Sequence, residues 1–253
     1  MTQPASRPSV IVDCDPGHDD VFAMVVANHY AKLLGITVVH GNAPLTRTLP
    51  NALISCDVFG INAPVFAGAE RPLIAPPRNA PHIHGESGLG GPELPPVTRT
   101  AEKTHAVEAI IELVRKHEGD GVWLMPLGPL TNIALALRMA PDLGKRIAGI
   151  SLMGGGTLHG NRAPHAEFNI WADPEAAAAL LEEQRLPGGG PVEGEVRRVE
   201  DRPVGSGLQE ERRQQRERPI APQIFAEDQE REWFAASDRA MPGLVADALD
   251  KDG

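Results

Sequence analysis

The chain has 253 residues, 42% of them hydrophobic, so it can bury the core of one large α/β domain or of two small ones. Its formal net charge of −10 argues against nucleic acid or an anionic membrane as a partner, because both would need a basic surface. Two cysteines give no disulfide framework, and no stretch is typical of a signal peptide or a membrane span. A cytoplasmic protein is expected.

Short apolar runs alternate with helical patterns along most of the chain. Strands are predicted near Val10, at 34–39, near Val65, at 122–126 and at 147–153, and helices at 19–32, 46–60, 104–117, 130–140 and 174–183. This alternation predicts an α/β fold with an open, mainly parallel sheet and helices on both faces. Ligands of such sheets bind at the carboxyl ends of the strands, which directs the search for a site to the segments after each strand.

The sequence changes character after residue 183. Residues 1–183 are predicted to form the α/β core, whereas residues 184–224 carry Gly and Pro clusters, many arginines and no periodicity, which is typical of disorder. Residues 225–253 regain some apolar character and are compatible with a short helix. A surface linker or a change of reading frame would each explain 184–224, and the C-terminal part of the sheet is expected to be incomplete.

Four aspartates crowd the turn between the first strand and the first helix. Asp13 and Asp15 come at the end of the strand, and Asp19 and Asp20 open the helix. Neighbouring carboxylates resist simultaneous ionisation, so the cluster indicates a hard divalent cation. Asp19 and Asp20 diverge by roughly 100° around the helix axis and can therefore serve different partners, one a metal and the other a substrate hydroxyl.

Other interpretations of this cluster remain open. Asp19 and Asp20 would each favour a helix N-terminus by ~0.3–1 kcal/mol, and Asp13 can be an ordinary buried hydrogen-bonding residue. An aspartyl-phosphate phosphotransferase also carries Asp-x-Asp after a strand. The Pro-Gly-x-Asp-Asp turn that follows here is not typical of that class.

Further polar residues follow the later strands. Asn42 would offer an amide to a sugar hydroxyl or to a metal-bound group, or else is an ordinary turn residue. The carbonyl of Leu127 can add an oxygen to a cation shell, whereas Asn132 is expected only to stabilise a turn. In 153–161 the glycines lack the GxGxxG spacing, so close approach of the backbone to a small ligand is the better interpretation.

The segment AEFNIWADPEAA adds a second group of candidates. Glu167 and Asn169 alternate with Phe168, so they can bind two hydroxyls beside an aromatic wall, and Asp173 looks like a simple helix start. His82 and His84 have His-x-His spacing, but a loop that covers the pocket is preferred over a zinc site because no cysteine accompanies them.

These motifs together resemble the inosine–uridine-preferring nucleoside hydrolases, a family of calcium-dependent N-ribohydrolases. The resemblance spans about 9–181 and rests on DCDPGHDD, HGN, NAPHIHGESGLGG, PLGPLTNIALAL and LMGGGTLHGNRAPHAEFNIWADPEAA. It implies hydrolysis of a small ribonucleoside to ribose and free base, with Ca²⁺ bound by Asp15, Asp20 and the Leu127 carbonyl. Asp15 would also take the proton from the metal-bound water. The implied substrate-binding residues are Asp19, Asn42, His84, Met153, Asn161, Glu167, Phe168 and Asn169.

The chain departs from the family pattern in its C-terminal part. The resemblance implies a later Asp that completes the metal shell, commonly preceded by a His, but no His follows His165 here, and neither Asp238 nor Asp247 has that context. A catalytically impaired homologue that only binds metal or ribose is therefore the alternative. The sequence predicts no base preference, and a homo-oligomer is possible.

Overall fold

The computed structural model describes residues 7–91, 94–155, 160–163 and 166–183. The predicted segments 184–224 and 225–253 lie outside these residues. The described strands are β1 Ser9–Cys14, β2 Lys32–Val38, β3 Val65–Ala67, β4 Trp123–Pro126 and β5 Gly149–Ile150. The helices are α1 His18–Tyr30, α2 Leu45–Phe59, α3 Pro81–His84, α4 Ala106–Lys116, α5 Thr131–Met139, the 3₁₀ helix η1 Pro141–Lys145, α6 Phe168–Ala172 and α7 Pro174–Glu183.

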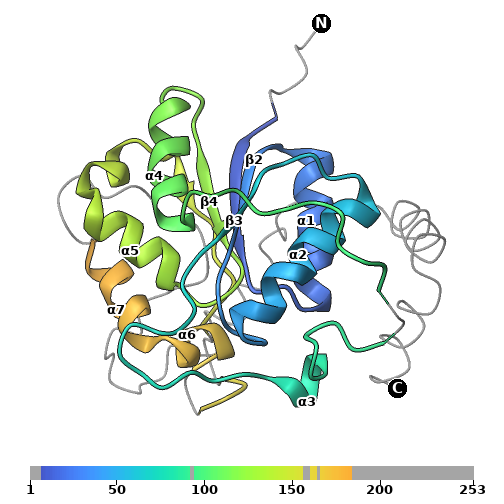
Figure 1. Ribbon diagram of the computed structural model, residues 1–253. Helices are drawn as coiled ribbons and strands as arrows, with labels where there is room; N and C mark the ends of the chain where they lie inside the picture. The colour runs from blue at the N-terminus through green and yellow to red at the C-terminus, as the bar shows by residue number, and fades with distance from the viewer. Residues whose placement is uncertain (1–6, 92–93, 156–159, 164–165, 184–253) are drawn as a thin grey trace, which may run out of the picture. The chain divides into compact units, whose positions relative to one another are not determined.

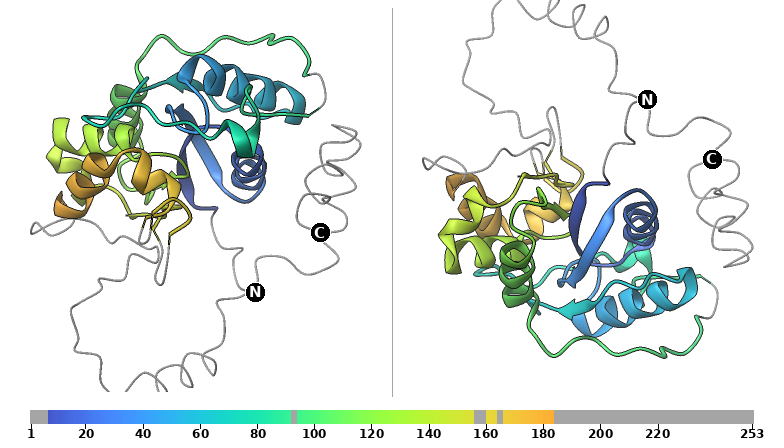
Figure 2. Two further views of the ribbon diagram at one scale, coloured as in Figure 1. Left: turned by 90° about the horizontal axis from the view of Figure 1, so that it is seen from below. Right: turned by 90° about the horizontal axis from the view of Figure 1, so that it is seen from above.

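The strands form one five-stranded sheet in the order β3-β2-β1-β4-β5, and every strand pair in it is parallel. Helices α1 and α2 lie on one face, and α4, α5 and α7 lie on the other (Figure 1). Figure 2 shows the same two layers from both ends of the sheet. The predicted α/β class with a parallel sheet and helices on both faces is confirmed. No helix of the described residues is long and apolar enough to cross a membrane.

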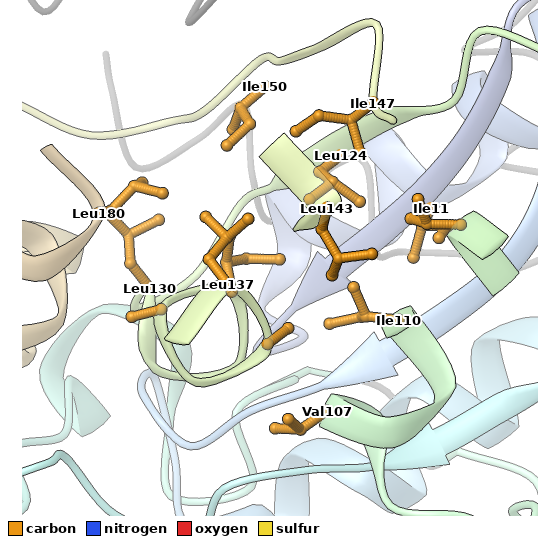
Figure 3. Packing of buried hydrophobic residues seen from close by; sticks show 14 of the residues in the cluster. Ile11, Val107, Ile110, Leu124, Leu130, Leu137, Leu143, Ile147, Ile150 and Leu180 are labelled. Carbon is orange, nitrogen blue, oxygen red and sulfur yellow. The ribbon is translucent and has the colours of Figure 1, made fainter. Parts of the chain in front are cut away.

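Alternation along β1 explains the two layers. Val10, Val12 and Cys14 pack with residues of α1 and α2, whereas Ile11 packs with α4, α5 and α7. A strand presents successive side chains to opposite faces, so an apolar run can be buried on both sides. Figure 3 shows the hydrophobic cluster on the Ile11 face of the sheet, where Ile11 and Leu124 of the strands contact residues of the helices on that face.

Two features differ from the predicted elements. The strand expected at 147–153 is only Gly149–Ile150, and the short helices α3 and α6 and the 3₁₀ helix η1 were not predicted. Glu167 caps α6, and Phe168 and Asn169 begin it, so the alternation of these residues in the sequence falls at a helix start. A helix of one turn or slightly more has too few residues to display a 3.6-residue period.

Candidate functional site

The predicted site residues converge where three neighbouring strands end. Asp15 follows β1, Asn42 follows β2 and Leu127 follows β4, and these three strands are adjacent in the sheet. Parallel strands present their carboxyl ends at one edge, so segments far apart in the sequence meet there. The prediction that the site lies at this edge is consistent with the observed arrangement.

The Asp15 carboxylate lies in a tight, buried pocket made of backbone. Its Oδ2 atom accepts a 2.6 Å hydrogen bond from the amide of Asn42, and Asn42 Nδ2 donates to the Asp15 carbonyl at 3.1 Å. A Cβ atom at Gly41 or Gly128 would overlap with this carboxylate. Only glycine at both positions leaves room for it.

Asp20 shares a partner with Asp15. Its Oδ2 atom accepts hydrogen bonds from the Gly17 amide at 2.9 Å and from Asn42 Nδ2 at 3.3 Å. The bond to Gly17 caps α1, which agrees with the helix-start interpretation, yet Asp20 Oδ1 is buried without a partner. One asparagine thus holds both carboxylates.

Charge and burial raise the pKa values of both groups. Burial, followed by the neighbouring Asp20, raises the pKa of Asp15 well above its ordinary value. Burial, followed by the charge of Asp19, raises the pKa of Asp20 to about 8. Like charges in a desolvated space disfavour ionisation, and a bound cation would remove that penalty.

The residues present suit a hard cation. Asp15 Oδ1 and Asp20 Oδ1 are buried and have no hydrogen-bond partner, which leaves two oxygens without a donor. The Leu127 carbonyl at the same edge accepts a 2.6 Å hydrogen bond from Asn169 Nδ2. Within the described residues no group of three or more His, Cys, Asp or Glu side chains is arranged for a metal. A shell built from these residues would therefore have two carboxylates and a carbonyl.

The other two aspartates have separate surroundings. Asp19 is exposed while Asp20 is buried, as their divergence around the helix predicts. Asp13 Oδ1 accepts hydrogen bonds from Thr37 Oγ1 at 2.6 Å and Asn132 Nδ2 at 2.8 Å. Burial raises the pKa of Asp13 to about 7 although both bonds lower it. Asp13 fits the interpretation as a buried hydrogen-bonding residue.

A second group of side chains lies around the start of α6. Glu167 Oε2 accepts from the Asn169 amide at 2.8 Å, and Glu167 Oε1 lies 3.5 Å from Asn161 Nδ2. Asn169 Nδ2 also donates to the Met153 carbonyl at 3.0 Å. Burial raises the pKa of Glu167. Asn169, through its bonds to the carbonyls of Leu127 and Met153, connects this group to the end of β4.

The aromatic candidate lies at this group, and one of the two histidine candidates lies at the acidic turn. Phe168 is buried beside Trp171, with ring centroids 6.2 Å apart, and the Arg162 guanidinium lies over its ring. The His84 ring lies against Gly17, where a Cβ atom would come within 2.7 Å of it, and His82 faces Arg162 instead. The two histidines have different partners, so His84 is the one beside the acidic turn.

Sequence reasoning underestimated Asp173 and Asn132. Asp173 does cap α7 at the Ala176 amide, but it also accepts a 2.6 Å bond from Thr131 Oγ1 and a bond from the Leu73 amide. Asn132 does not stabilise a local turn, since it binds Asp13 and accepts from the amide of Ala69. Apart from the cap at Ala176, these contacts join residues 42 to 119 positions apart, and no spacing in the sequence signals them.

Known proteins are similar to this chain in both sequence and fold. The family model for inosine-uridine preferring nucleoside hydrolases matches residues 10–197. The pyrimidine-specific ribonucleoside hydrolase RihB of Escherichia coli O9:H4 (strain HS) is 51% identical over 174 residues, which are 68% of this chain and 55% of that protein. The chain therefore spans about half the length of the curated relatives it matches.

Solved structures agree with this match. A purine-preferring ribonucleoside hydrolase from Gardnerella vaginalis is 36% identical with a TM-score of 0.68, covering 73% of this chain and 59% of that one. An inosine-guanosine nucleoside hydrolase is 32% identical with a TM-score of 0.65, covering 74% and 59%. A sheet of this order, the acidic turn at its carboxyl edge and these matches agree: the chain belongs to the inosine-uridine preferring nucleoside hydrolase family.

Proposed function

We propose that this protein hydrolyses the N-glycosidic bond of ribonucleosides to ribose and free base, with Ca²⁺ held by Asp15, Asp20 and the Leu127 carbonyl. The observation that carries the proposal is the pair of buried, unpartnered oxygens Asp15 Oδ1 and Asp20 Oδ1. The relatives are named as hydrolases of pyrimidine, purine, or inosine and guanosine nucleosides. The substrate class is therefore ribonucleosides, without a chosen base.

Calcium suits these ligands because it accepts six to eight oxygens, including carbonyls and waters. Bound there, the cation would lower the pKa of water and so supply a nucleophile at neutral pH. The residues themselves would arrange the proton transfer. Asn42 fixes Asp15 through Oδ2, and Asp15 would also accept the proton of the water as general base.

The second group would bind the sugar. Cleavage of an N-glycosidic bond passes through an oxocarbenium-like ribose, so nearby anionic and amide oxygens stabilise its positive charge. Glu167 and Asp19 supply carboxylates, and Asn161, Asn169 and the Met153 backbone supply polar groups for hydroxyls. Asn42, which lies beside Asp15 and Asp20, would also bind a hydroxyl of the sugar. We assign Phe168 and His84 to the walls of the same pocket.

The test is ribose release from inosine and uridine by the 253-residue chain, with Ca²⁺ and with a chelator. We expect turnover that requires Ca²⁺ and falls by roughly 10²–10⁴ in Asp15→Asn, the usual contribution of general acid–base catalysis. Asp142→Asn, a change at a surface ion pair of α4 and η1, is the control and should leave turnover unchanged.

A second candidate function is binding without catalysis, because the described residues supply no group that we can assign to protonate the leaving base. Calcium binding by calorimetry without ribose release would favour it. We also propose a cytoplasmic location, which is supported by Cys14 and Cys56, two buried free thiols.

A further inference from the structure

A chain of side-chain hydrogen bonds lies behind the site and joins His40, Thr131 and Asp173. The Thr131 hydroxyl donates to Asp173 Oδ2 at 2.6 Å, and His40 Nε2 lies 3.1 Å from the Thr131 oxygen. The exposed fractions of these residues are 1%, 1% and 0%. The chemistry proposed above uses none of them, although burying such polar groups is costly unless they are paired.

The number of hydrogens on each group decides which atom donates and which accepts in these two hydrogen bonds. Thr131 Oγ1 is the donor in the 2.6 Å contact with Asp173 Oδ2, and a threonine hydroxyl carries only one hydrogen. The Thr131 oxygen must then accept from His40, so His40 Nε2 carries a hydrogen. A second hydrogen on Nδ1 would be buried without an acceptor, so the neutral Nε2–H tautomer is the form that fits this arrangement.

Each end of this series of hydrogen bonds, His40 and Asp173, lies next to a different part of the site. His40 lies in the segment after β2 that leads to Asn42, the residue that holds both Asp15 and Asp20. Asp173 directly follows α6, which begins with the Glu167 and Asn169 group.

Thr131, the middle residue of the hydrogen-bonded series, and further hydrogen bonds of Asp173 complete the connection. Thr131 is the first residue of α5 and follows the Leu127–Pro129 turn at the end of β4. Asp173 also accepts from the amide of Leu73 at 3.1 Å and from the amide of Ala176 at 3.0 Å. The three segments that carry the site are thus tied together at one buried point.

We propose that His40, Thr131 and Asp173 are positioning residues that hold the carboxylate side of the site, around Asp15 and Asp20, in register with its amide side, around Asn169. Its catalytic consequence rests on the proposed nucleoside hydrolysis. The geometric part does not, because it concerns the placement of Asn42 and Asn169 in the protein without ligand. Residues that orient ligating groups from outside typically contribute ~10–100-fold to metal affinity or activity.

The test compares Thr131→Val with Thr131→Ser in the full chain. Valine keeps the shape and removes the hydroxyl, whereas serine keeps the hydroxyl. We expect T131V to bind Ca²⁺ ~10–100-fold more weakly by calorimetry, and T131S to bind it like the wild type. Leu143→Ala, in the buried core at η1, controls for lost stability and should leave Ca²⁺ affinity unchanged while the protein is folded. Equal Ca²⁺ affinity of T131V and T131S would overturn the proposal.

Nuclear magnetic resonance provides a readout without metal or substrate. We expect the side-chain amide signals of Asn42 and Asn169 to move in T131V and to stay in T131S, and the wild-type His40 ring to carry its hydrogen on Nε2. A hydrogen on His40 Nδ1 would overturn the proposal even if T131V does not fold. If the wild type neither binds Ca²⁺ nor releases ribose, the proposed function fails, while these signals still decide the positioning role.

Discussion

The side-chain amide of Asn132 donates a 2.8 Å hydrogen bond to Asp13 Oδ1 and so fastens the start of α5 to the end of β1. Asn132 is completely buried, and its Oδ1 atom accepts from the amide of Ala69 at 2.9 Å. Asn132→Leu would remove both hydrogen bonds; Asp13 Oδ1 keeps the one from Thr37, whereas the part-buried Ala69 amide loses its acceptor. We expect a loss of roughly 1–3 kcal/mol in the free energy of unfolding, measured by urea titration.

Thr98→Val is the matched control for Asn132→Leu. Thr98 Oγ1 also donates to a carboxylate, Asp57 Oδ2 at 2.8 Å, but this pair is at the surface. Water replaces the lost hydrogen bond there, so the urea midpoint should hardly move. Equal losses in the two variants would show that burial does not decide the importance of the Asn132 contact.

The close packing of glycine against the Asp15 carboxylate leads to a prediction about Ca²⁺ binding. A Cβ atom at Gly128 would overlap with the Asp15 carboxylate, so Gly128→Ala should displace it and weaken Ca²⁺ binding measured by calorimetry. Gly119→Ala is the control for lost stability: its φ of +94° makes alanine strained there, but a Cβ atom meets nothing within 4 Å, so Ca²⁺ affinity should stay unchanged while the protein is folded. Unchanged Ca²⁺ affinity in G128A would contradict the assignment of Asp15 as a ligand.

His40 predicts a pH dependence of stability. Burial lowers its pKa from 6.5 to about 4, with Asp173 acting in the opposite direction. The folded protein therefore favours the neutral ring, and this contribution is present above pH 6.5 and lost as the pH falls towards 4. A shift of this size corresponds to up to ~3 kcal/mol, since one pKa unit is worth about 1.4 kcal/mol.

The comparison of wild type with His40→Gln isolates this effect. The raised pKa values of Asp13 and Asp20 act in the opposite sense, because their protonation stabilises the fold as the pH falls. These carboxyls are common to both proteins and cancel in the difference. The wild type's advantage over H40Q in urea unfolding should shrink from pH 7 to pH 4.5, and a constant advantage would contradict a neutral His40.

The sequence predicts the strands, the longer helices and the carboxyl edge because these depend on local patterns. The apolar runs of β1, β2 and β4 fix the strands, and parallel topology then brings Asp15, Asn42 and the Leu127 carbonyl to one edge. That much of the candidate site needs only the order of the elements along the chain.

The remaining contacts have no local signal. Thr131 meets His40 across 91 residues and Asp173 across 42, and each residue type is common in ordinary loops and helix starts. Asparagine is common in turns, but Asn132 lies buried against Asp13, so its predicted role in stabilising a turn was wrong. Such partners depend on how α5 packs on the sheet, which side-chain volume and crossing geometry decide.

The last prediction concerns the cation itself. Asp15→Asn keeps an oxygen that can accept the hydrogen bond from the Asn42 amide, but it removes the negative charge that a cation requires. A ligand stabilises the folded state according to its occupancy, by about 2.7 kcal/mol at a concentration of 100 times Kd. We expect Ca²⁺ to raise the Tm of the wild type and to have little effect on D15N, measured by scanning calorimetry after chelator treatment.

Asp142→Asn serves as the reference, because Asp142 pairs with Arg115 and Arg146 at the surface. It changes the net charge by the same amount as D15N, so non-specific binding of Ca²⁺ to an acidic protein would respond equally in both variants. Specific binding predicts that D142N keeps the full rise in Tm and that D15N loses it. An undiminished rise in D15N would remove Asp15 from the metal site and, with it, the role of general base beside the cation.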